Sequence, residues 1–363
     1  MSSRDEDKCA GMPRLLLAGP FPGPVGGVSV HLSRLHAWLS ARGIAVDRVD
    51  ESRVKKTGVY NLRSFRVGSY LRYLTRCDVA HIHSSVHLFR ILHIVACRML
   101  GLRVVVTIHS WRPSRIATWI NRLFLRLAHE VILVSEGIND HLRLRRHRIL
   151  PAFLPPTEHR CSLPREIQCF LDAARVRGGA VLCANAYELI ENRGEDLYGL
   201  DLCVELLHRL VHQSGVEASL VFVVCCEARN NPLYIHAREA VARHGLEGRV
   251  CLYNEPVDFI ALLSQCNVVL RPTNTDGDAL TIREALYYGV PVIASDVVKR
   301  PEGTILFKNR DVQDLAFRTI GVLKNGHRCA QAPVQAAYDS YFEQYLNLYL
   351  GILCGRASSG SPS

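Results

Sequence analysis

The sequence predicts an α/β protein made of two doubly wound domains with parallel sheets. Short apolar segments of strand length alternate with longer amphipathic segments along the whole 363-residue chain. Near-continuous apolar strands separated by helices are typical of parallel sheets that are covered on both faces. A chain of this length also exceeds one ordinary core, so two such domains are expected.

The predicted elements follow the same rhythm in both halves. In the first half, strands are predicted at 14–19, 78–85, 103–110 and 130–136. Helical patterns lie between them at 31–42, 87–100 and 115–128. In the second half, strands are predicted at 180–186, 219–225, 249–254, 267–273 and 291–295. Helices are predicted there at 200–213, 234–244 and 280–288, followed by two more at 311–325 and 335–353.

A proline-rich segment, 147–164, marks the predicted join between the domains. Proline blocks both helix and central strand, so this stretch should be a linker. We therefore expect a first domain over 1–165 and a second over 166–335. A helix over 336–356 is expected to pack back on the first domain. The segment 357–363 is expected to be a disordered tail.

Composition indicates a globular protein of the cytoplasm. Hydrophobic residues make up 48% and charged residues 21% of the chain, which is ordinary for a globular domain. The longest apolar runs have strand length, and the first residues lack the apolar region of a secretory signal. The 13 cysteines are scattered and include no CxxC pair, so reduced, mostly buried thiols are expected rather than disulfides.

The charge is unevenly distributed. Residues 1–165 carry 26 Lys+Arg and 11 Asp+Glu, whereas residues 166–363 carry 18 and 23. The basic half should meet an anionic partner, such as lipid headgroups, a phosphorylated acceptor or nucleic acid; the alternative is a solvated basic surface without a partner. Segments 63–76 and 143–148 combine arginines with apolar residues and favour an anionic membrane surface. No basic stripe with interleaved aromatics supports nucleic-acid binding.

Candidate binding residues lie just after predicted strands, where open parallel sheets bind ligands. Gly26 and Gly27 precede a helix and would let a ligand approach its free N–H groups; a simple tight turn is the alternative. His109 lies at the carboxyl end of a strand, where it could bond a sugar hydroxyl or be structural. His81 and His83 alternate on a predicted strand, so they should face opposite sides and make a poor pair of metal ligands.

The segment TNTDGDALTIREALYYGVPVIASD, 273–296, allows two readings. Asp276 and Asp278 could clamp a metal ion beside a nucleotide diphosphate. Alternatively, Asp276 and Glu284 form an acidic pair that grips sugar and ribose hydroxyls, while Asp278 serves as a helix N-cap or first-turn residue. The N–H groups of Gly277, Ala279 and Leu280 would then hold an anion at the helix start. The order of strand, glycine loop and helix favours the acidic pair without a metal.

Nearly the whole chain resembles the retaining, nucleotide-sugar-dependent glycosyltransferases of family 4, which have the GT-B fold. The resemblance is carried by the early GG loop, DVAHIHSS, VTIHS, EVILVSEGI, LPAFLPP, YGLDLCVELLHRL and DGDALTIREALYYGVPVIASD. It implies two Rossmann-like domains facing across a cleft, the first binding the acceptor and the second the nucleotide-sugar donor. It also implies catalysis without a bound metal or other cofactor, since helix N-termini and basic residues stabilise the leaving diphosphate.

The resemblance assigns roles to individual residues. Asp276 would contact the donor sugar, Glu284 the ribose, Gly27 the donor phosphates, and His109 the sugar near the reacting carbon. Three positions depart from the family pattern. Asp276 stands where glutamate is common, Asn185 where a phosphate-binding arginine is usual, and Tyr198 where a lysine is usual.

Arginines elsewhere could replace the two missing phosphate cations. Arg271 ends a predicted strand on the ligand edge and is the first choice; the other candidates are Arg193, Arg283 and Arg300. The resemblance thus implies transfer of a hexose-type sugar to a hydroxyl of a saccharide or lipid-linked acceptor, in surface polysaccharide synthesis. The alternatives are a nucleotide-sugar-binding protein without catalysis and a GT-B nucleotide-sugar epimerase.

Overall fold

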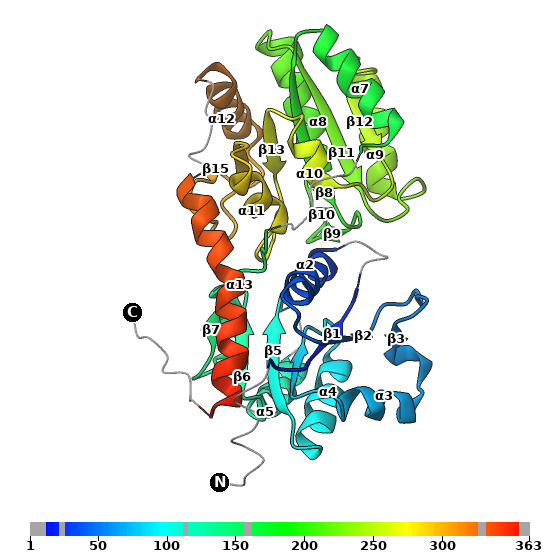
Figure 1. Ribbon diagram of the computed structural model, residues 1–363. Helices are drawn as coiled ribbons and strands as arrows, with labels where there is room; N and C mark the ends of the chain where they lie inside the picture. Colours follow the sequence, from blue (N-terminus) through cyan, green and yellow to red (C-terminus); the bar gives the residue numbers. More distant parts are fainter. Residues whose placement is uncertain (1–11, 22–25, 112–114, 156–161, 326–331, 356–363) are drawn as a thin grey trace. The chain divides into compact units, whose positions relative to one another are not determined.

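The computed structural model describes residues 12–21, 26–111, 115–155, 162–325 and 332–355 (Figure 1). Contacts divide the chain into two compact units. The amino-terminal unit comprises Met1–Thr157 and Ala337–Ser363, and the carboxyl-terminal unit comprises Glu158–Ala336. The division after Thr157 falls within the proline-rich segment. The predicted tail, 357–363, lies outside the described residues.

The amino-terminal unit is built on a seven-stranded sheet in which every pairing is parallel. Its strands are β1 Leu15–Gly19, β2 Val46–Asp50, β3 Tyr60–Asn61, β4 Val79–Ile82, β5 Arg103–Ile108, β6 Glu130–Leu133 and β7 Arg148–Ile149. They are arranged in the order β3-β2-β1-β4-β5-β6-β7. The direction of winding reverses between β1 and β4, which is the arrangement of a Rossmann-type sheet.

Two helical layers cover this sheet with separate apolar cores. One core contains buried residues of α3 Val67–Leu74, α4 His87–Met99, the end of α5 Arg115–Leu125, and α6 Gly137–Leu142. The other contains α2 Gly27–Ala41 and the final helix, α13 Ala332–Leu353. In α13, Phe342 stacks on Trp38 with ring centroids 4.8 Å apart, and Tyr345 and Tyr349 are fully buried. The last helix is therefore part of the amino-terminal core.

The carboxyl-terminal unit has a six-stranded parallel sheet of the same design. Its strands are β8 Ala180–Ala186, β11 Ala218–Val224, β12 Val250–Tyr253, β13 Val268–Arg271, β14 Val292–Ser295 and β15 Ile305–Phe307. They lie in the order β12-β11-β8-β13-β14-β15, so the winding reverses between β8 and β13. The helices are α7 Arg165–Val176, α8 Leu200–His208, α9 Pro232–Arg243, α10 Phe259–Leu263, α11 Leu280–Tyr287 and α12 Val312–Asn325, with a π-helical turn, Arg209–Gln213, continuing α8.

Sequence patterning missed several short strands. β2 has the sequence VDRVD, whose polar residues hide its apolar side, and β3, β7 and β15 have at most three residues each. A two-stranded hairpin, β9 Glu191–Asn192 and β10 Glu195–Asp196, was also unexpected. Its turn residues, Arg193 and Gly194, both have positive φ angles, as two-residue hairpin turns require.

The structure also reports on cysteines and hydropathy. The ten cysteines in the described part of the chain are all free; five of them are buried, which is half and not most of them. Within the described residues, no helix combines the length and the apolar character needed to cross a bilayer.

Candidate functional site

Arg271, Asp276 and Arg300 form a buried ion cluster at the carboxyl edge of the carboxyl-terminal sheet. Arg271 ends β13, Asp276 lies in the following loop, and Arg300 follows β14. Arg271 donates to Asp276 through Nε at 3.0 Å and Nη2 at 3.1 Å, and Arg300 donates through Nη1 at 2.8 Å. The side chains of Arg271, Asp276 and Arg300 are 12%, 9% and 2% exposed. Two guanidinium groups share one carboxylate, so the cluster keeps a net positive charge.

The cluster fixes the ionisation of Asp276. Burial alone would raise the pKa of this carboxyl group, but the charges and hydrogen bonds of Arg271 and Arg300 outweigh burial and hold it well below its ordinary value. Thr273 Oγ1 and the backbone N–H of Gly277 also donate to Asp276, at 3.2 and 3.0 Å. The N–H of Gly277 is therefore engaged by Asp276 and differs from the open helix-start donor that the sequence predicted.

Arg271 also touches Asn185 and Tyr198, two of the three positions at which the sequence departs from the pattern of the family that it resembles. Its Nη1 donates to the backbone oxygen of Asn185 at 3.3 Å. Its guanidinium carbon lies 5.2 Å from the centroid of the Tyr198 ring, within the range of a cation–π contact. The side chain of Asn185 accepts a hydrogen bond from Thr281 at 2.9 Å. A guanidinium group therefore lies beside both substituted positions.

The tight approach around Tyr198 depends on Gly199. Gly199 precedes α8 with a φ of +68°, and a Cβ atom there would lie 2.5 Å from the backbone oxygen of Pro272. Only glycine fits this close contact between the start of α8 and the end of β13. Asp196 accepts hydrogen bonds from the N–H groups of Tyr198 and Leu200, which fixes the same turn.

The other two acidic residues of interest in the segment 273–296, Asp278 and Glu284, have surroundings that differ from those of Asp276. Asp278 accepts from Arg283 Nε at 2.6 Å and is 3% exposed. The N-cap of α11 is Ala279, and Asp278 lies before it. The prediction that Asp278 is the N-cap or a first-turn residue was wrong, because Ala279 is the N-cap and α11 begins at Leu280. Glu284 is buried in the middle of α11, at 5% exposure, and Leu280 is the first residue of that helix.

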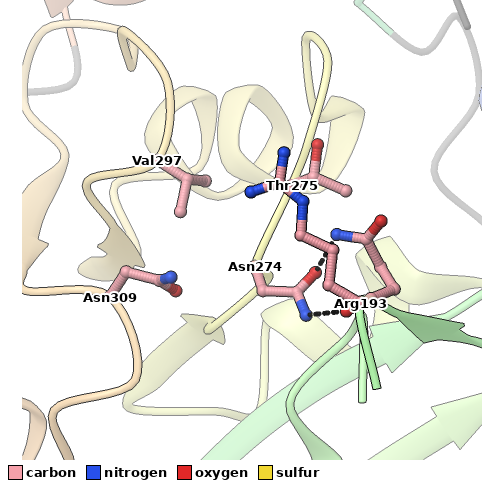
Figure 2. A pocket seen from close by; sticks show the side chains of 6 residues that line it. Arg193, Asn274, Thr275, Val297 and Asn309 are labelled. Atoms are coloured by element: carbon pink, nitrogen blue, oxygen red, sulfur yellow. Dashed lines mark hydrogen bonds between the residues drawn. The ribbon is translucent and has the colours of Figure 1, made fainter. Parts of the chain in front are cut away.

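A polar cavity of about 390 Å³ is lined in part by the residues that precede Asp276 in the sequence. Figure 2 shows the side chains that line it: Asn192, Arg193, Asn274, Thr275, Val297 and Asn309. Asn274 and Thr275 immediately precede Asp276, while Val297 and Asn309 follow β14 and β15. The cavity therefore lies at the carboxyl edge of the sheet, where open α/β sheets bind ligands.

Two asparagines connect the hairpin turn to this cavity. Asn192 Nδ2 donates to Asn274 Oδ1, and Asn274 Nδ2 donates to the backbone oxygen of Asn192, each at 3.1 Å. These bonds hold the β9–β10 hairpin, with the exposed Arg193 at its turn, over the loop that follows β13. Arg193 is thus a cavity residue, whereas Asn192, Asn274 and Asn309 were not predicted, since single polar residues in loops give no pattern.

In the amino-terminal unit, His83 and His109 follow β4 and β5 at adjacent strand ends. His83 Nδ1 and His109 Nε2 are 3.0 Å apart. The rings of His81 and His83 lie with centroids 4.0 Å apart, so the prediction that they face opposite sides was wrong. The reason is that β4 ends at Ile82, and the alternation of a strand no longer applies to His83.

The glycines of the amino-terminal unit lie where the sequence placed them. Gly26 is the N-cap of α2 and Gly27 its first residue, and no described atom lies within 4 Å of a Cβ built on Gly27. The N–H of Gly26 donates to Ser29 Oγ at 2.8 Å. No described residue therefore crowds Gly27, while the N–H of Gly26 is engaged by the hydroxyl of Ser29.

Sequence reasoning missed a buried polar network that includes Ser84, the residue after His83. Glu51 follows β2 and accepts from Ser84 and from His93 Nε2, the latter at 3.0 Å. Arg90 is 2% exposed and donates to the backbone oxygen of Ser84 at 2.6 Å and to Asn121 at 3.1 Å. The signal in the sequence was the acidic pair Asp50 and Glu51, but it follows a strand that patterning did not find.

The chain is similar to known glycosyltransferases in part of its sequence and in its fold. Residues 193–325 match the family model of the glycosyl transferases group 1. That segment contains Arg271, Asp276, Glu284 and Arg300. No match is found among curated proteins.

Three solved structures illustrate the similarity of fold. Alr3699/HepE of Anabaena, in complex with UDP and glucose, shares 15% identity over 94% of this chain and 99% of its own, with a TM-score of 0.69. A glycosyltransferase from Rickettsia africae shares 13% identity over 96% and 100%, with a TM-score of 0.68. The lipopolysaccharide outer core galactosyltransferase WaaB shares 14% identity over 93% and 99%, with a TM-score of 0.60. The chain therefore has the GT-B fold, as the sequence predicted.

Proposed function

We propose that this protein is a glycosyltransferase that moves a sugar from a nucleotide-sugar donor to a hydroxyl group, with retention at the anomeric carbon. The proposal rests on the buried cluster of Arg271, Asp276 and Arg300 within the segment that matches group 1 glycosyl transferases. Alr3699/HepE was crystallised with UDP and with UDP-glucose, so a UDP-sugar is the first donor to test.

In this proposal, Arg271 supplies the positive charge for the donor diphosphate. It lies at the end of β13, where the winding of the sheet reverses beside β8. It contacts the backbone of Asn185 and the ring of Tyr198, the positions where related enzymes carry phosphate-binding cations. Arg300 adds the second guanidinium, and Asp276 orients both through charge-assisted hydrogen bonds.

The reaction would break the bond between the anomeric carbon and the diphosphate oxygen and form a bond from that carbon to the acceptor oxygen. The acceptor proton passes to the departing diphosphate or to a nearby base. Negative charge grows on the leaving diphosphate during this step, and preorganised cations in a buried site stabilise it more than water does. Burial of Arg300, and its fixed position on Ser295 and Asp276 at 3.1 and 2.8 Å, supplies that preorganisation.

Other residues of the site would hold the rest of the donor. The amide-lined cavity next to Asp276 has the size of a small-ligand pocket, and Arg193 and Asn274 would contact donor hydroxyls or phosphate there. Glu284 would accept hydrogen bonds from the ribose. His109 would face the donor sugar, and Gly27 would allow the phosphates close to α2, as in the related enzymes.

We propose that donor binding needs no metal ion. Asp276 is shared by two arginines, and Asp278 is paired with Arg283. Neither carboxylate is thus placed as a simple anionic ligand for Mg²⁺, which prefers freely available oxygen atoms. The same crowding around Asp276 also supports a second candidate function, a protein that binds a nucleotide-sugar without transferring it.

The acceptor is proposed to be a saccharide carried on a lipid, reached at an anionic membrane. Large apolar side chains are exposed on α3, α4 and α5, which pack on one shared core and therefore turn outward on the same side of the sheet. They include Val67, Leu71, Leu88, Leu92, Met99, Ile116, Trp119 and Leu123. Tyr70 and Leu74, two apolar residues of the predicted membrane-binding segment 63–76, are buried in the core and do not belong to this surface.

Transfer is tested by incubating the protein with UDP-, GDP-, CMP- and dTDP-sugars, each with a mixture of saccharide and lipid-linked acceptors. A glycosyltransferase yields a lengthened acceptor and the free nucleotide of one donor, a nucleoside diphosphate from UDP-, GDP- or dTDP-sugars and CMP from a CMP-sugar. A binding protein gives a donor-dependent thermal shift without product. A changed sugar on the same nucleotide, without an acceptor, would indicate an epimerase and contradict the proposal.

A further inference from the structure

Three histidines from separate elements converge in the amino-terminal unit. His31 lies in α2, His83 follows β4, and His109 follows β5. One ring nitrogen of each lies within 4.8 Å of the corresponding nitrogens of the other two. His31 and His83 are buried, at 0% and 1% exposure, and His109 is half-buried. The group is therefore enclosed on the side of His31 and His83 and accessible on the side of His109.

Two nitrogens in this group have no hydrogen-bond partner among the described residues. His31 Nδ1 lies 2.6 Å from the backbone oxygen of Ala152, which can only accept, so His31 carries its proton on Nδ1. Its Nε2 is then a bare lone pair, and it is buried without a partner, as is Nε2 of His83. Leaving a buried polar atom unsatisfied is unfavourable in a native protein, so these nitrogens need an explanation.

The neighbouring His81 shows what a satisfied structural histidine looks like here. His81 is fully buried as well, but Nδ1 bonds to the hydroxyl of Tyr349 and Nε2 bonds to Thr107 Oγ1, both at 2.7 Å. Its ring lies 4.0 Å from that of His83, so the two share the same surroundings. The protein therefore provides partners for both ring nitrogens of His81 and, in the part of the chain that the structure describes, leaves one buried ring nitrogen without a partner on each of His31 and His83.

We propose that His31, His83 and His109 bind a divalent transition-metal ion of the zinc type. Imidazole nitrogens are the ligands that Zn²⁺, Ni²⁺ and Cu²⁺ share. Two nitrogens on one tetrahedral Zn²⁺ are roughly 3.3 Å apart, given Zn–N bonds of about 2.0–2.1 Å. The 3.0 Å between His83 Nδ1 and His109 Nε2 is close to that separation, and a ring nitrogen of His31 lies within 4.8 Å of the ligand nitrogens of the other two.

The surroundings match what such a site requires. A ligating histidine commonly donates its other N–H to a backbone oxygen, as His31 does to Ala152. Burial lowers the pKa of His31 to about 4 and lowers the pKa values of His83 and His109 as well. Three protein ligands with an accessible side near His109 leave a coordination position for water or another ligand.

This inference goes beyond the proposed function, because the donor-binding residues lie in the carboxyl-terminal unit and would need no metal. His109 belongs to both proposals, so the readout is metal binding and not activity. The metal-stripped protein is titrated with Zn²⁺ by calorimetry. It is also titrated with Co²⁺, whose visible absorption reports tetrahedral nitrogen coordination. One ion per chain is expected, with a Co²⁺ spectrum of a low-coordinate site.

Matched variants locate the ion. His31→Ala and His83→Ala should each weaken Zn²⁺ binding at least a hundredfold, and His109→Ala, at a half-buried position with little effect on folding, should do the same. His81→Gln is the control within the same core. His244→Ala is the second control, because His208, His212 and His244 also cluster, with ring centroids 4.2 Å apart for His208 and His244.

Circular dichroism and thermal unfolding first establish that each variant is folded. Binding that survives in folded His109→Ala, binding that His244→Ala abolishes, or a wild-type protein that takes up no Zn²⁺ at micromolar concentration would each overturn the proposal. Failure of the donor experiments would leave it untouched, because UDP-sugar binding is measured separately in the presence of a chelator.

Discussion

Arg271 and Asp276 form a two-point ion pair, with nitrogen–oxygen distances of 3.0 and 3.1 Å, at the point where the carboxyl-terminal sheet reverses its winding. Arg300, which follows β14, donates to the same carboxylate at 2.8 Å. Sequence reasoning named Asp276 as a residue that grips the sugar directly. The structure shows Asp276 bonded to two arginines, which we propose it positions; its contact with the donor sugar stays a prediction.

Asp276→Asn is expected to destabilise the fold. The substitution leaves two largely buried guanidinium groups without their shared charge partner, and breaking a buried pair typically costs about 3–5 kcal/mol. Chemical denaturation gives the free energy of unfolding. Asp172→Asn is the control, since Asp172 pairs with Arg175 on the surface at 58% exposure, where a loss below about 1 kcal/mol is expected. Equal losses for both variants would argue against a stabilising cluster.

Stability should also depend on pH through Asp276. Because its pKa in the folded protein lies below the ordinary value of about 3.9, its contribution is fully present above that value and declines as the pH falls below it. Unfolding free energies measured between pH 6 and pH 3 should therefore fall less steeply at the acid end in Asp276→Asn than in the wild type. Parallel curves would show that Asp276 is not ionised against the two arginines.

Arg271→Ala is expected to lower kcat/KM for the donor by roughly 10- to 150-fold. The loss corresponds to about 1.5–3 kcal/mol for a hydrogen bond to a charged group. Arg271→Lys should recover only part of it, because lysine cannot reproduce the two-point geometry. Arg249→Ala removes another ion-paired arginine of the same unit, at Glu217, and should leave kinetics unchanged. An unaffected Arg271→Ala enzyme would remove Arg271 from the phosphate site.

Glu284→Gln is expected to weaken donor binding and leave the fold intact if Glu284 accepts ribose hydroxyls. A donor at about 100 times its Kd stabilises the wild type by roughly 2.7 kcal/mol, and the thermal shift should shrink in the variant.

Repeating the titration with EDTA should not change the wild-type shift. If EDTA abolishes it and Mg²⁺ restores it, the Asp276–Asp278 loop is a metal site after all.

Removing exposed apolar side chains should weaken membrane binding. Ile116 and Trp119 are 74% and 67% exposed on α5, so their joint replacement by serine should leave stability nearly unchanged. If the two side chains contribute roughly 2 kcal/mol to the free energy of membrane binding, the variant should partition into anionic liposomes about 30-fold more weakly. Phe317→Ser, at 71% exposure on α12 of the other unit, is the control. Co-sedimentation that is absent at low salt, or that ignores lipid charge, contradicts a membrane role.

The sequence by itself determined the fold class and most of the strands and helices. Apolar segments such as LVFVV in β11 and VVVTI in β5 are nearly continuous because both faces of a parallel sheet are buried. It also placed Arg271 at the end of a strand and Asp276 and His109 just after strands, since that spacing is local. It missed β2, where Asp47 and Arg48 interrupt the pattern, and with it Glu51.

Only the tertiary structure decided which of these residues meet. Arg300 reaches Asp276 across 24 residues, and His31 meets His83 and His109 from a helix far away in the sequence. Parallel strands bring their carboxyl ends to one edge, but the side chains that touch there depend on strand order and on where each strand ends. Local periodicity contains neither, which is why His83, one residue beyond β4, turned toward His109 instead of following the strand.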